Sequence, residues 1–189
     1  MISASAPSFN AQLKTGLLGE SQISRWLIGR GFQVMPAYEV ELSHGKGPRL
    51  FTAEGRFISP DLLAFNAAKI LWIEAKTKSA FTWHRASQTW QTGIDRRHWT
   101  HYLEVEKLTP FPVWILFLHR AGNQAKDTPA GMQCPSGLFG NTIRKLAASI
   151  HHEHDNHGPS GMVYWTLTAL IKIAPIEHFE SPAPEMANS

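Results

Sequence analysis

The chain has 189 residues, 43% of them hydrophobic and 17% charged, which excludes a disordered polypeptide and predicts a folded protein with a substantial core. We expect a single domain over residues 1–180, with a core at about 10–120, an extension at 121–180 and a flexible tail at 181–189. The net charge of +3 weakly favours an anionic partner such as nucleic acid. A single cysteine, Cys134, excludes an internal disulfide and favours a reducing compartment. No stretch reads as a signal peptide or a membrane span, so we expect a cytoplasmic protein.

The first expected element is a helix over residues 10–30 that ends at Gly31. Its apolar positions on one arc of the helix are Leu13, Leu17, Ile23 and Leu27. Glu20 falls in the middle of this arc. Because an unpaired charge in a core is costly, such a glutamate needs a metal ion, a cation or a hydrogen-bond network. A local ion pair with Arg25 or Lys14 is the simpler alternative.

The next segments predict a strand and then a basic connection. Residues 32–40 read as a strand, in which Pro36 indicates a sheet edge or a bulge. Residues 41–57 combine several glycines with Lys46, Arg49 and Arg56, and they predict a loop or a flexible hairpin. A solvated connection is the simpler interpretation of this segment. The alternative is an arm that contacts phosphates near a functional site.

Two apolar runs at residues 62–65 and 70–73, joined by a polar turn, predict a strand, a turn and a second strand. Asp61 precedes the first run, and Glu74 and Lys76 follow the second. Because side chains alternate along a strand, Glu74 and Lys76 lie on one face, and the neighbouring strand can bring Asp61 to them. An ordinary exposed charge pair is the alternative. The apolar runs argue against it, because they are typical of central strands.

These residue types suit a hard divalent cation. Mg²⁺ takes oxygen ligands and is typically held by one or two carboxylates, while a phosphate supplies further oxygens. Asp61 and Glu74 fit that role. A lysine beside the metal can lower the pKa of an attacking water or stabilise charge on phosphorus, and Lys76 is placed to do so.

The sequence Ser59-Pro60-Asp61, followed after twelve residues by Glu74-Ala75-Lys76, resembles the core motif of the PD-(D/E)xK nuclease superfamily. The nearest likeness is to the resolvase-like branch, in which a glutamate on an early helix precedes the motif. The resemblance covers residues 13–119. It implies a restriction-endonuclease-like α/β fold, with a central mixed sheet flanked by helices in the order αβββαβ and C-terminal additions.

The resemblance also implies an activity. It implies hydrolysis of phosphodiester bonds in DNA with Mg²⁺, or Mn²⁺ as a substitute, giving a 5′ phosphate and a 3′ hydroxyl. Asp61, Glu74 and the Ala75 carbonyl would hold the metal, while Glu20 would bind a second ion or orient water. Lys76 would assist the attacking water. A homodimer is expected because many relatives pair two sites; a module that binds nucleic acid without cutting it is the competing hypothesis.

Residues 78–101 collect cations and aromatic side chains around a single acid, as nucleic-acid grooves do, although core positions are an equal alternative for the tryptophans. The cations expected to contact DNA are Lys78, Arg85, Arg96 and Arg97. Trp99, Tyr102 and Leu103 are expected in the core of a helix over residues 95–108. Gln88 or Gln91 is expected near the site, since the resemblance implies a glutamine on the helix after the motif.

Beyond the motif, residues 112–119 predict a strand buried on both faces, and residues 121–140 predict a long loop. Asn141 reads as the cap of a helix that continues through Ile150. The histidines of 151–157 follow it. They could bind Zn²⁺, but their simpler interpretation is a favourable place at the negative end of a helix dipole. Shorter elements are expected at 162–167 and 170–174.

Overall fold

The computed structural model describes residues 9–37, 48–120 and 128–180, with helix side chains from Leu18 onward. Its centre is a six-stranded sheet in the order β1-β4-β5-β8-β9-β12. These strands are β1 (Gln33–Pro36), β4 (Leu62–Phe65), β5 (Ile70–Lys78), β8 (Val113–His119), β9 (Gly137–Thr142) and β12 (Ile171–Ala174). The β5–β8 pair is parallel, and the other neighbouring pairs are antiparallel. The predicted mixed α/β sheet is therefore confirmed.

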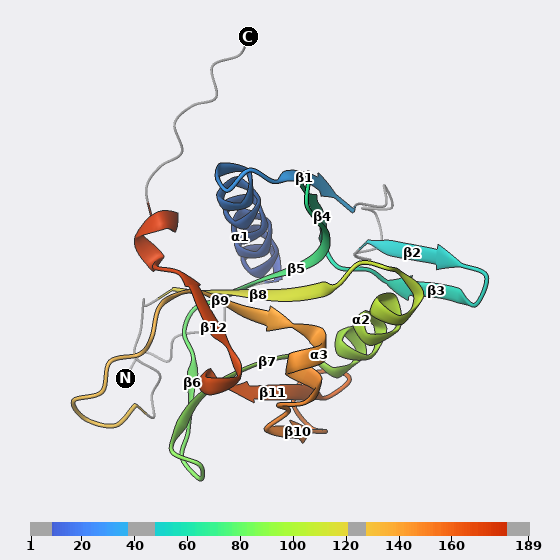
Figure 1. Cartoon of the computed structure of the whole chain (residues 1–189). Coiled ribbons are helices and arrows are strands. Elements are labelled where there is room, and N and C mark those ends of the chain that lie inside the picture. Colours follow the sequence, from blue (N-terminus) through green and yellow to red (C-terminus); the bar gives the residue numbers. More distant parts are fainter. Residues whose placement is uncertain (1–8, 38–47, 121–127, 181–189) are drawn as a thin grey trace.

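Different elements cover the two faces of this sheet (Figure 1). Helix α1 (Phe9–Gly29) packs on one face, and α2 (Arg96–Leu108) and α3 (Ile143–Ala147) lie on the other. A second sheet, in the order β10-β11-β7-β6, completes the second face. Its strands are β10 (His152–His154), β11 (Met162–Thr166), β7 (Thr89–Asp95) and β6 (Thr82–His84). Two 3-10 turns, η2 (Leu167–Ala169) and η3 (Ile176–Phe179), flank β12.

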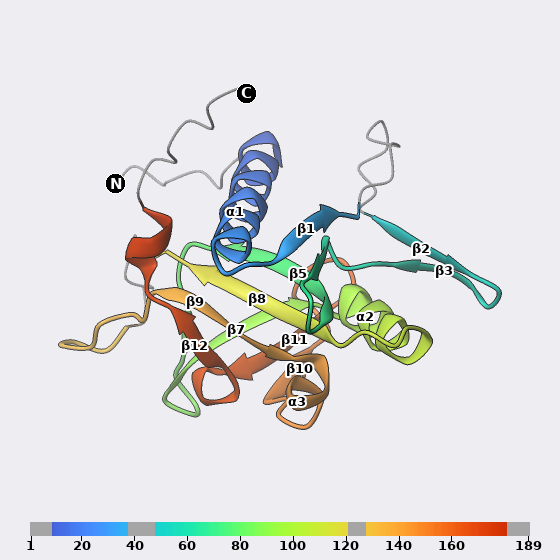
Figure 2. The same ribbon diagram turned by 45° about the horizontal axis from the view of Figure 1, so that its top comes forward.

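The remaining element is a hairpin of β2 (Arg49–Thr52) and β3 (Gly55–Ile58), which projects from the body beside α2 (Figures 1 and 2). The described part of the basic segment is thus a hairpin, one of the two forms predicted. Lys46 lies outside the described residues.

Strands β5 and β8 lie in the middle of the sheet, and this explains their continuous apolar runs. In β8, Val113 and all residues from 115 to 119 are buried. The prediction of a strand buried on both faces is confirmed. At the edge of the same sheet, β1 ends at Pro36, where a residue without an N–H group costs no ladder hydrogen bond.

Helix α1 lies directly on β5 because Gly19 has no side chain. A Cβ atom at this position would overlap the Thr77 side chain of β5. One turn further on, Ile23 and Leu27 are buried against the same face. The apolar arc predicted for this helix is therefore its packing face, at the described positions.

Three expectations for the C-terminal part are wrong. Residues 137–140, expected in a loop, belong to β9, which continues to Thr142. Its Gly140 lies so close to β8 that a Cβ atom would be 2.5 Å from the Ile115 carbonyl oxygen. The glycine at this position, which suggested a loop, instead allows β9 and β8 to lie close together. The cap of α3 is Thr142, because the Asn141 amide instead donates to the Ala169 carbonyl oxygen at 3.0 Å.

The third error concerns the histidines. Helix α3 ends at Ala147, and the histidines that follow lie on β10 and its turn. The helix-dipole explanation of this run does not hold, because no helix ends there. The strand β11 predicted at 162–167 and the element at 170–174 are both present. No helix in the described ranges is long and apolar enough to cross a membrane.

Candidate active site

The candidate site lies beside the part of β5 that extends beyond the end of β4. The β4–β5 ladder closes with Leu62 opposite Ile73, so no strand of the described ranges pairs with the later residues of β5 on that side. Asp61 fills this position. Its Oδ2 accepts a hydrogen bond from the Ala75 amide at 3.0 Å, and its carbonyl oxygen accepts one from the Ala37 amide at 2.9 Å. The Asp61 carboxylate is therefore fixed against the open edge of β5.

Glu74 and Lys76 lie on the same face of β5, as the alternation predicted. The Glu74 side chain is 0% exposed and forms an ion pair with the Lys76 ammonium group, which keeps 28% of its surface. Neither Glu74 oxygen has a well-directed hydrogen bond among the described residues. A buried carboxylate is stable only when its charge and its lone pairs are both satisfied. Glu74 thus has the capacity to bind a further cation.

The ionisation of the three side chains is coupled. Burial, and after it the negative charge of Glu74, raises the pKa of Asp61 to about 7, while Lys76 and the Ala75 amide act in the opposite direction. Burial opposes the charged form of Lys76, but the two carboxylates outweigh this effect and raise its pKa above the usual range. Two acids therefore share one permanently charged lysine. An added divalent cation would relieve the repulsion between them.

Helix α2 contributes two residues that sequence reasoning did not place in the site. Burial raises the pKa of Tyr102 well above its ordinary value, and the charges of Glu74 and Asp61 raise it further. Burial, followed by the charge of Lys76, lowers the pKa of His98 to about 4. These two residues are four apart and therefore lie on one face of α2. From the sequence, Tyr102 was predicted only as a core residue of this helix.

Glu20 approaches from a different direction. Helix α1 packs through Gly19 on Thr77, whose side chain lies on the face of β5 opposite to that of Lys76. Glu20 is half-buried, and its charge is the smallest of the contributions that act on the pKa of Lys76. The structure thus brings Glu20 near Lys76, but Glu20 does not share a face with Glu74.

Comparison with known proteins gives no match to a family model or to a curated protein. Among solved structures, the chain is similar to Hjc, a Holliday junction resolvase from the archaeal hyperthermophile Archaeoglobus fulgidus. The identity is 10% and the TM-score 0.48, over 82% of this chain and 90% of Hjc. It is also similar to D212, a nuclease from a fusselovirus, with 11% identity and a TM-score of 0.41, over 93% and 92% of the two chains.

The order of the core elements matches the order expected from the motif. Helix α1 and strands β1, β4 and β5 precede α2 and β8, with the hairpins β2–β3 and β6–β7 inserted between them. The Asp61 and Glu74-Ala75-Lys76 segments meet at the edge of β5. The chain resembles the PD-(D/E)xK nucleases.

The remaining candidates for DNA contact lie in three different environments. Arg97 and Arg85 are exposed, on the first turn of α2 and in the β6–β7 turn. Arg96 is engaged by Glu153 at 2.8 Å and Asp155 at 2.6 Å, so it fastens α2 to the β10–β11 hairpin. Lys78 follows Lys76 on the same face of β5, where burial and the charge of Lys76 lower its pKa to about 8.

The expectation that a glutamine follows the motif on a helix is wrong for this chain. Gln88 lies in the turn between β6 and β7 with φ 47°, and Gln91 is buried within β7. The two tryptophans of this hairpin, Trp83 and Trp90, are also buried, so they pack in the core and cannot stack on bases. The predicted core positions Trp99 and Tyr102 are confirmed, whereas Leu103 is only half-buried.

The histidines near β10 gather with His84 of β6. The ring centres of His151 and His152 lie 5.3 and 5.0 Å from that of His84. Even so, no group of three or more His, Cys, Asp or Glu side chains within the described ranges is arranged to hold a metal ion. The residues of the predicted nuclease motif form no such group of three either, because they contribute two carboxylates, those of Asp61 and Glu74.

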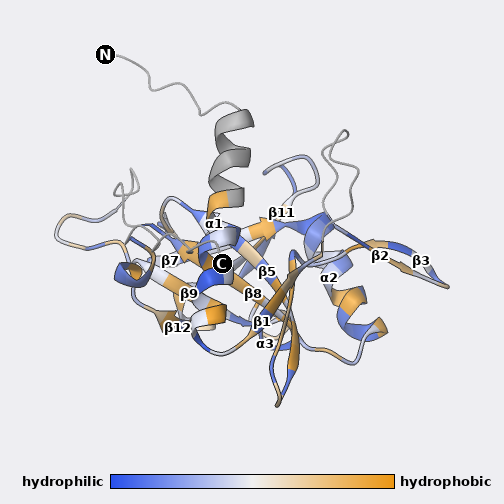
Figure 3. Cartoon of the chain, turned by 90° about the horizontal axis from the view of Figure 1, so that it is seen from above, coloured by the Kyte–Doolittle hydropathy of each residue, from blue (hydrophilic) through white to orange (hydrophobic). Residues whose placement is uncertain are grey.

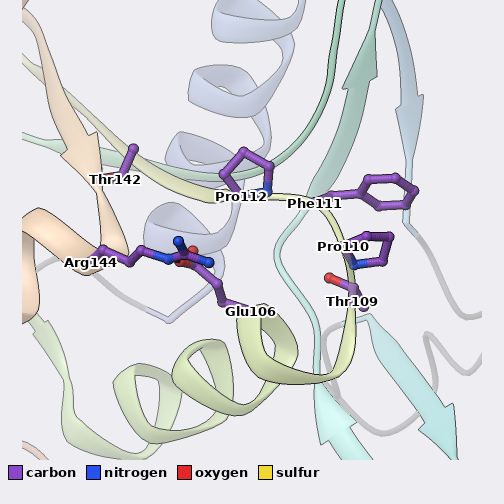
Figure 4. A pocket seen from close by; sticks show the side chains of 7 residues that line it. All are labelled: Glu106, Thr109, Pro110, Phe111, Pro112, Thr142 and Arg144. Carbon is purple, nitrogen blue, oxygen red and sulfur yellow. The ribbon is translucent and has the colours of Figure 1, made fainter.

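A pocket lies at the opposite end of α2 from His98. Its lining residues are Glu106, Thr109, Pro110, Phe111, Pro112, Thr142 and Arg144 (Figure 4). Glu106 is the centre of this pocket: its carboxylate accepts a hydrogen bond from the Val113 amide at 2.8 Å and pairs with Arg144. The acid is thus satisfied within the protein. We assign this pocket a structural role, the attachment of α2 to β8 and α3.

Proposed function

We propose that this protein is a Mg²⁺-dependent nuclease that hydrolyses phosphodiester bonds in DNA. The observation that carries the proposal is the fully buried Glu74 carboxylate, which shares Lys76 with Asp61 at the open edge of β5. A protein without catalytic need gains nothing from two repelling acids at this position, because apolar residues would stabilise the strand better.

The donor set fits Mg²⁺. Asp61 and Glu74 supply carboxylate oxygens, and the Ala75 carbonyl belongs to the same strand residue whose amide faces the open edge. When bound there, Mg²⁺ would supply charge stabilisation at the phosphate and a water of lowered pKa. Mn²⁺, which also takes oxygen ligands, is expected to substitute.

The chain's own residues would position the reacting groups. Lys76 stays protonated, since both acids stabilise its charge, and it therefore acts through its positive charge and by orienting the attacking water. Glu20 would orient water or bind a second ion from the side of α1. Arg85, Arg97 and Lys78 would hold the phosphates of the bound strand.

The test is cleavage of single-stranded, duplex, flapped and four-way DNA with Mg²⁺ or Mn²⁺, with Lys76→Ala and Glu74→Ala beside the wild type. Both variants are expected to lose at least 100-fold in rate, since removal of one stabilising group typically costs about that factor. Lys145→Ala, at an exposed lysine of α3, is the matched control. Wild-type binding without cutting, or equal rates in all variants, would refute the proposal and favour a non-cleaving binding module.

The homodimer implied by the resemblance requires a separate measurement. Light scattering of the purified chain, with and without DNA, gives the mass of the assembly. A mass of one chain in both conditions would rule it out.

A further inference from the structure

The β2–β3 hairpin has one face packed on the protein and one face directed away from it. Leu50 pairs with Phe57, and both pack against the main core. Phe57 also contacts His101 of α2 edge to face, with ring centres 6.0 Å apart. The hairpin is thus seated on α2 through this face and has a defined orientation.

The opposite face carries an aromatic ring and a cation. Phe51 pairs with Arg56 across the two strands, and because side chains alternate they lie on the face away from Leu50 and Phe57. Phe51 is 63% exposed, the largest fraction among the exposed large hydrophobic residues described. Arg56 is exposed beside it. Seen from above, the hairpin extends freely past α2 (Figure 3).

A row of basic groups connects this hairpin to the catalytic residues. Helix α2 carries Arg97, His98 and His101 in this order, and the His101 ring contacts Phe57 of the hairpin. Burial lowers the pKa of both histidines; the charge of Lys76 lowers that of His98 further, and the charges of Arg97 and Arg49 lower that of His101. These groups therefore follow one another along α2 toward the hairpin. The Nε of Arg49 is buried and has no hydrogen-bond partner in the described part of the chain.

The acidic residues near this row do not neutralise its positive charge. Asp95 acts on His98, but its carboxylate caps α2 by accepting from the Arg97 amide at 2.9 Å and from Ser160. Glu54 lies in the exposed turn at the tip of the hairpin, beyond Phe51. A phosphate chain that leaves the site along α2 therefore meets the cations Lys76, Arg97 and Arg49, with the neutral imidazoles of His98 and His101 between them as hydrogen-bonding groups.

We propose that the β2–β3 hairpin binds an unpaired segment of the DNA substrate, with Phe51 stacked on a base and Arg56 and Arg49 at the phosphates. A base inside a duplex has both faces covered by its neighbours, so a phenyl ring reaches it only at the cost of unstacking a base step, whereas an unpaired base offers its face without that cost. The preferred substrate class is therefore single-stranded DNA or DNA with an unpaired arm. This inference rests on the proposed function for the position of the cleaved bond, but not for the binding itself.

The experiment measures equilibrium binding to a fluorescent single strand and to a blunt duplex of the same sequence, with EDTA present so that nothing is cut. Phe51→Ala should weaken binding to the single strand roughly 5- to 100-fold, as expected for the loss of one stacked base, and duplex binding by less than about twofold. Arg56→Ala should weaken binding to both and lower the salt slope on the single strand by about 0.7.

Two residues of β12, at the other edge of the central sheet, are matched controls. Ile171 is an exposed apolar side chain, 46% accessible, and Lys172 is an exposed cation. Ile171→Ala and Lys172→Ala should leave both affinities unchanged. A strand that carries 2-aminopurine reports stacking directly, since its fluorescence should change on binding to the wild type and not to Phe51→Ala.

The inference and the proposed function fail in different ways. If Phe51→Ala binds the single strand as tightly as Ile171→Ala does, or loses duplex affinity equally, the inference is overturned whatever the nuclease activity. If the wild type never cuts and yet its single-strand binding depends on Phe51, the proposed activity fails and the inference holds.

Discussion

The amide of Ala75 donates a hydrogen bond of 3.0 Å to the carboxylate of Asp61, a residue 14 positions earlier in the chain. This bond joins the two halves of the motif where the β4–β5 ladder has ended. Because the backbone of β5 holds Asp61 in place, the carboxylate stays beside Glu74 in spite of their repulsion. The stability of the protein should therefore depend on the charge of Asp61.

Stability should fall as the pH rises through the titration of Asp61. The folded-state pKa is about 7 and the ordinary value is 3.8, so between them the folded protein holds a proton that the unfolded chain has lost. Asp61→Asn should be more stable than the wild type at pH 8, by roughly 2–4 kcal/mol, and nearly equal at pH 3.5. Urea unfolding at both pH values measures the difference. The exposed Glu177→Gln should show no such change, and an equal effect of Asp61→Asn at both pH values would contradict the assignment.

Substitutions of Glu74 and Lys76 should have strongly non-additive effects on the free energy of unfolding. Lys76→Met leaves the buried Glu74 carboxylate without its cation and should cost roughly 3–5 kcal/mol at pH 8. Combining it with Glu74→Gln should restore most of that loss, because no uncompensated charge then remains. A double-mutant cycle by urea unfolding gives the coupling energy. Additive single effects would show that the two side chains do not interact.

Gly19 should be intolerant of a side chain, whereas Gly29 of the same helix should accept one. Gly19→Ala would force α1 away from Thr77, at a cost of roughly 1–3 kcal/mol, and would displace Glu20. Nothing lies within 4 Å of a Cβ atom at Gly29, where alanine should be neutral or slightly stabilising. Thermal unfolding of the two variants tests this contrast. Equal melting temperatures would argue against the close approach of α1 to β5.

Glu106 should matter for folding and not for cleavage. Glu106→Ala removes the acceptor of the buried Val113 amide and should destabilise the protein by roughly 2–3 kcal/mol. Glu104 lies two residues before Glu106 on α2 and forms only an exposed ion pair with Lys107, so Glu104→Ala should lower the free energy of unfolding by less than about 0.5 kcal/mol. Both variants should cut DNA at the wild-type rate per folded molecule. A selective loss of cleavage in Glu106→Ala would place the pocket of Figure 4 in the active site.

Much of the framework follows from local sequence alone. The apolar runs before Glu74 and at residues 113–119 predicted central strands, because a strand covered on both faces needs apolar residues at every position. The alternation of a strand put Glu74 and Lys76 on one face without knowledge of their neighbours. The helix expected from Asp95 begins one residue later, at Arg96, and Asp95 is its N-cap, since a carboxylate suits the free amides there.

The sequence alone misplaced elements whose residues serve contacts with distant parts of the chain. Gly140 reads as a loop signal, but β8 requires a glycine at that point. Gln91 was expected near the site, yet it is buried in β7 between β6 and β11, while Trp83 and Trp90, for which the sequence left groove and core open, pack in the main core. Neither effect leaves a mark in a single sequence.

The sequence by itself determined the candidate motif: two acids and a lysine at the spacing of strand residues, within an α/β order of elements. Only the tertiary structure decided which groups meet them. It directed His98 and Tyr102 toward Lys76 and Glu74, engaged Arg96 with Glu153 and Asp155, and set Phe51 on the outward face of a hairpin. The physical reason is that strand alternation is a local property, whereas the depth of a charge and its neighbours depend on elements far away in the chain.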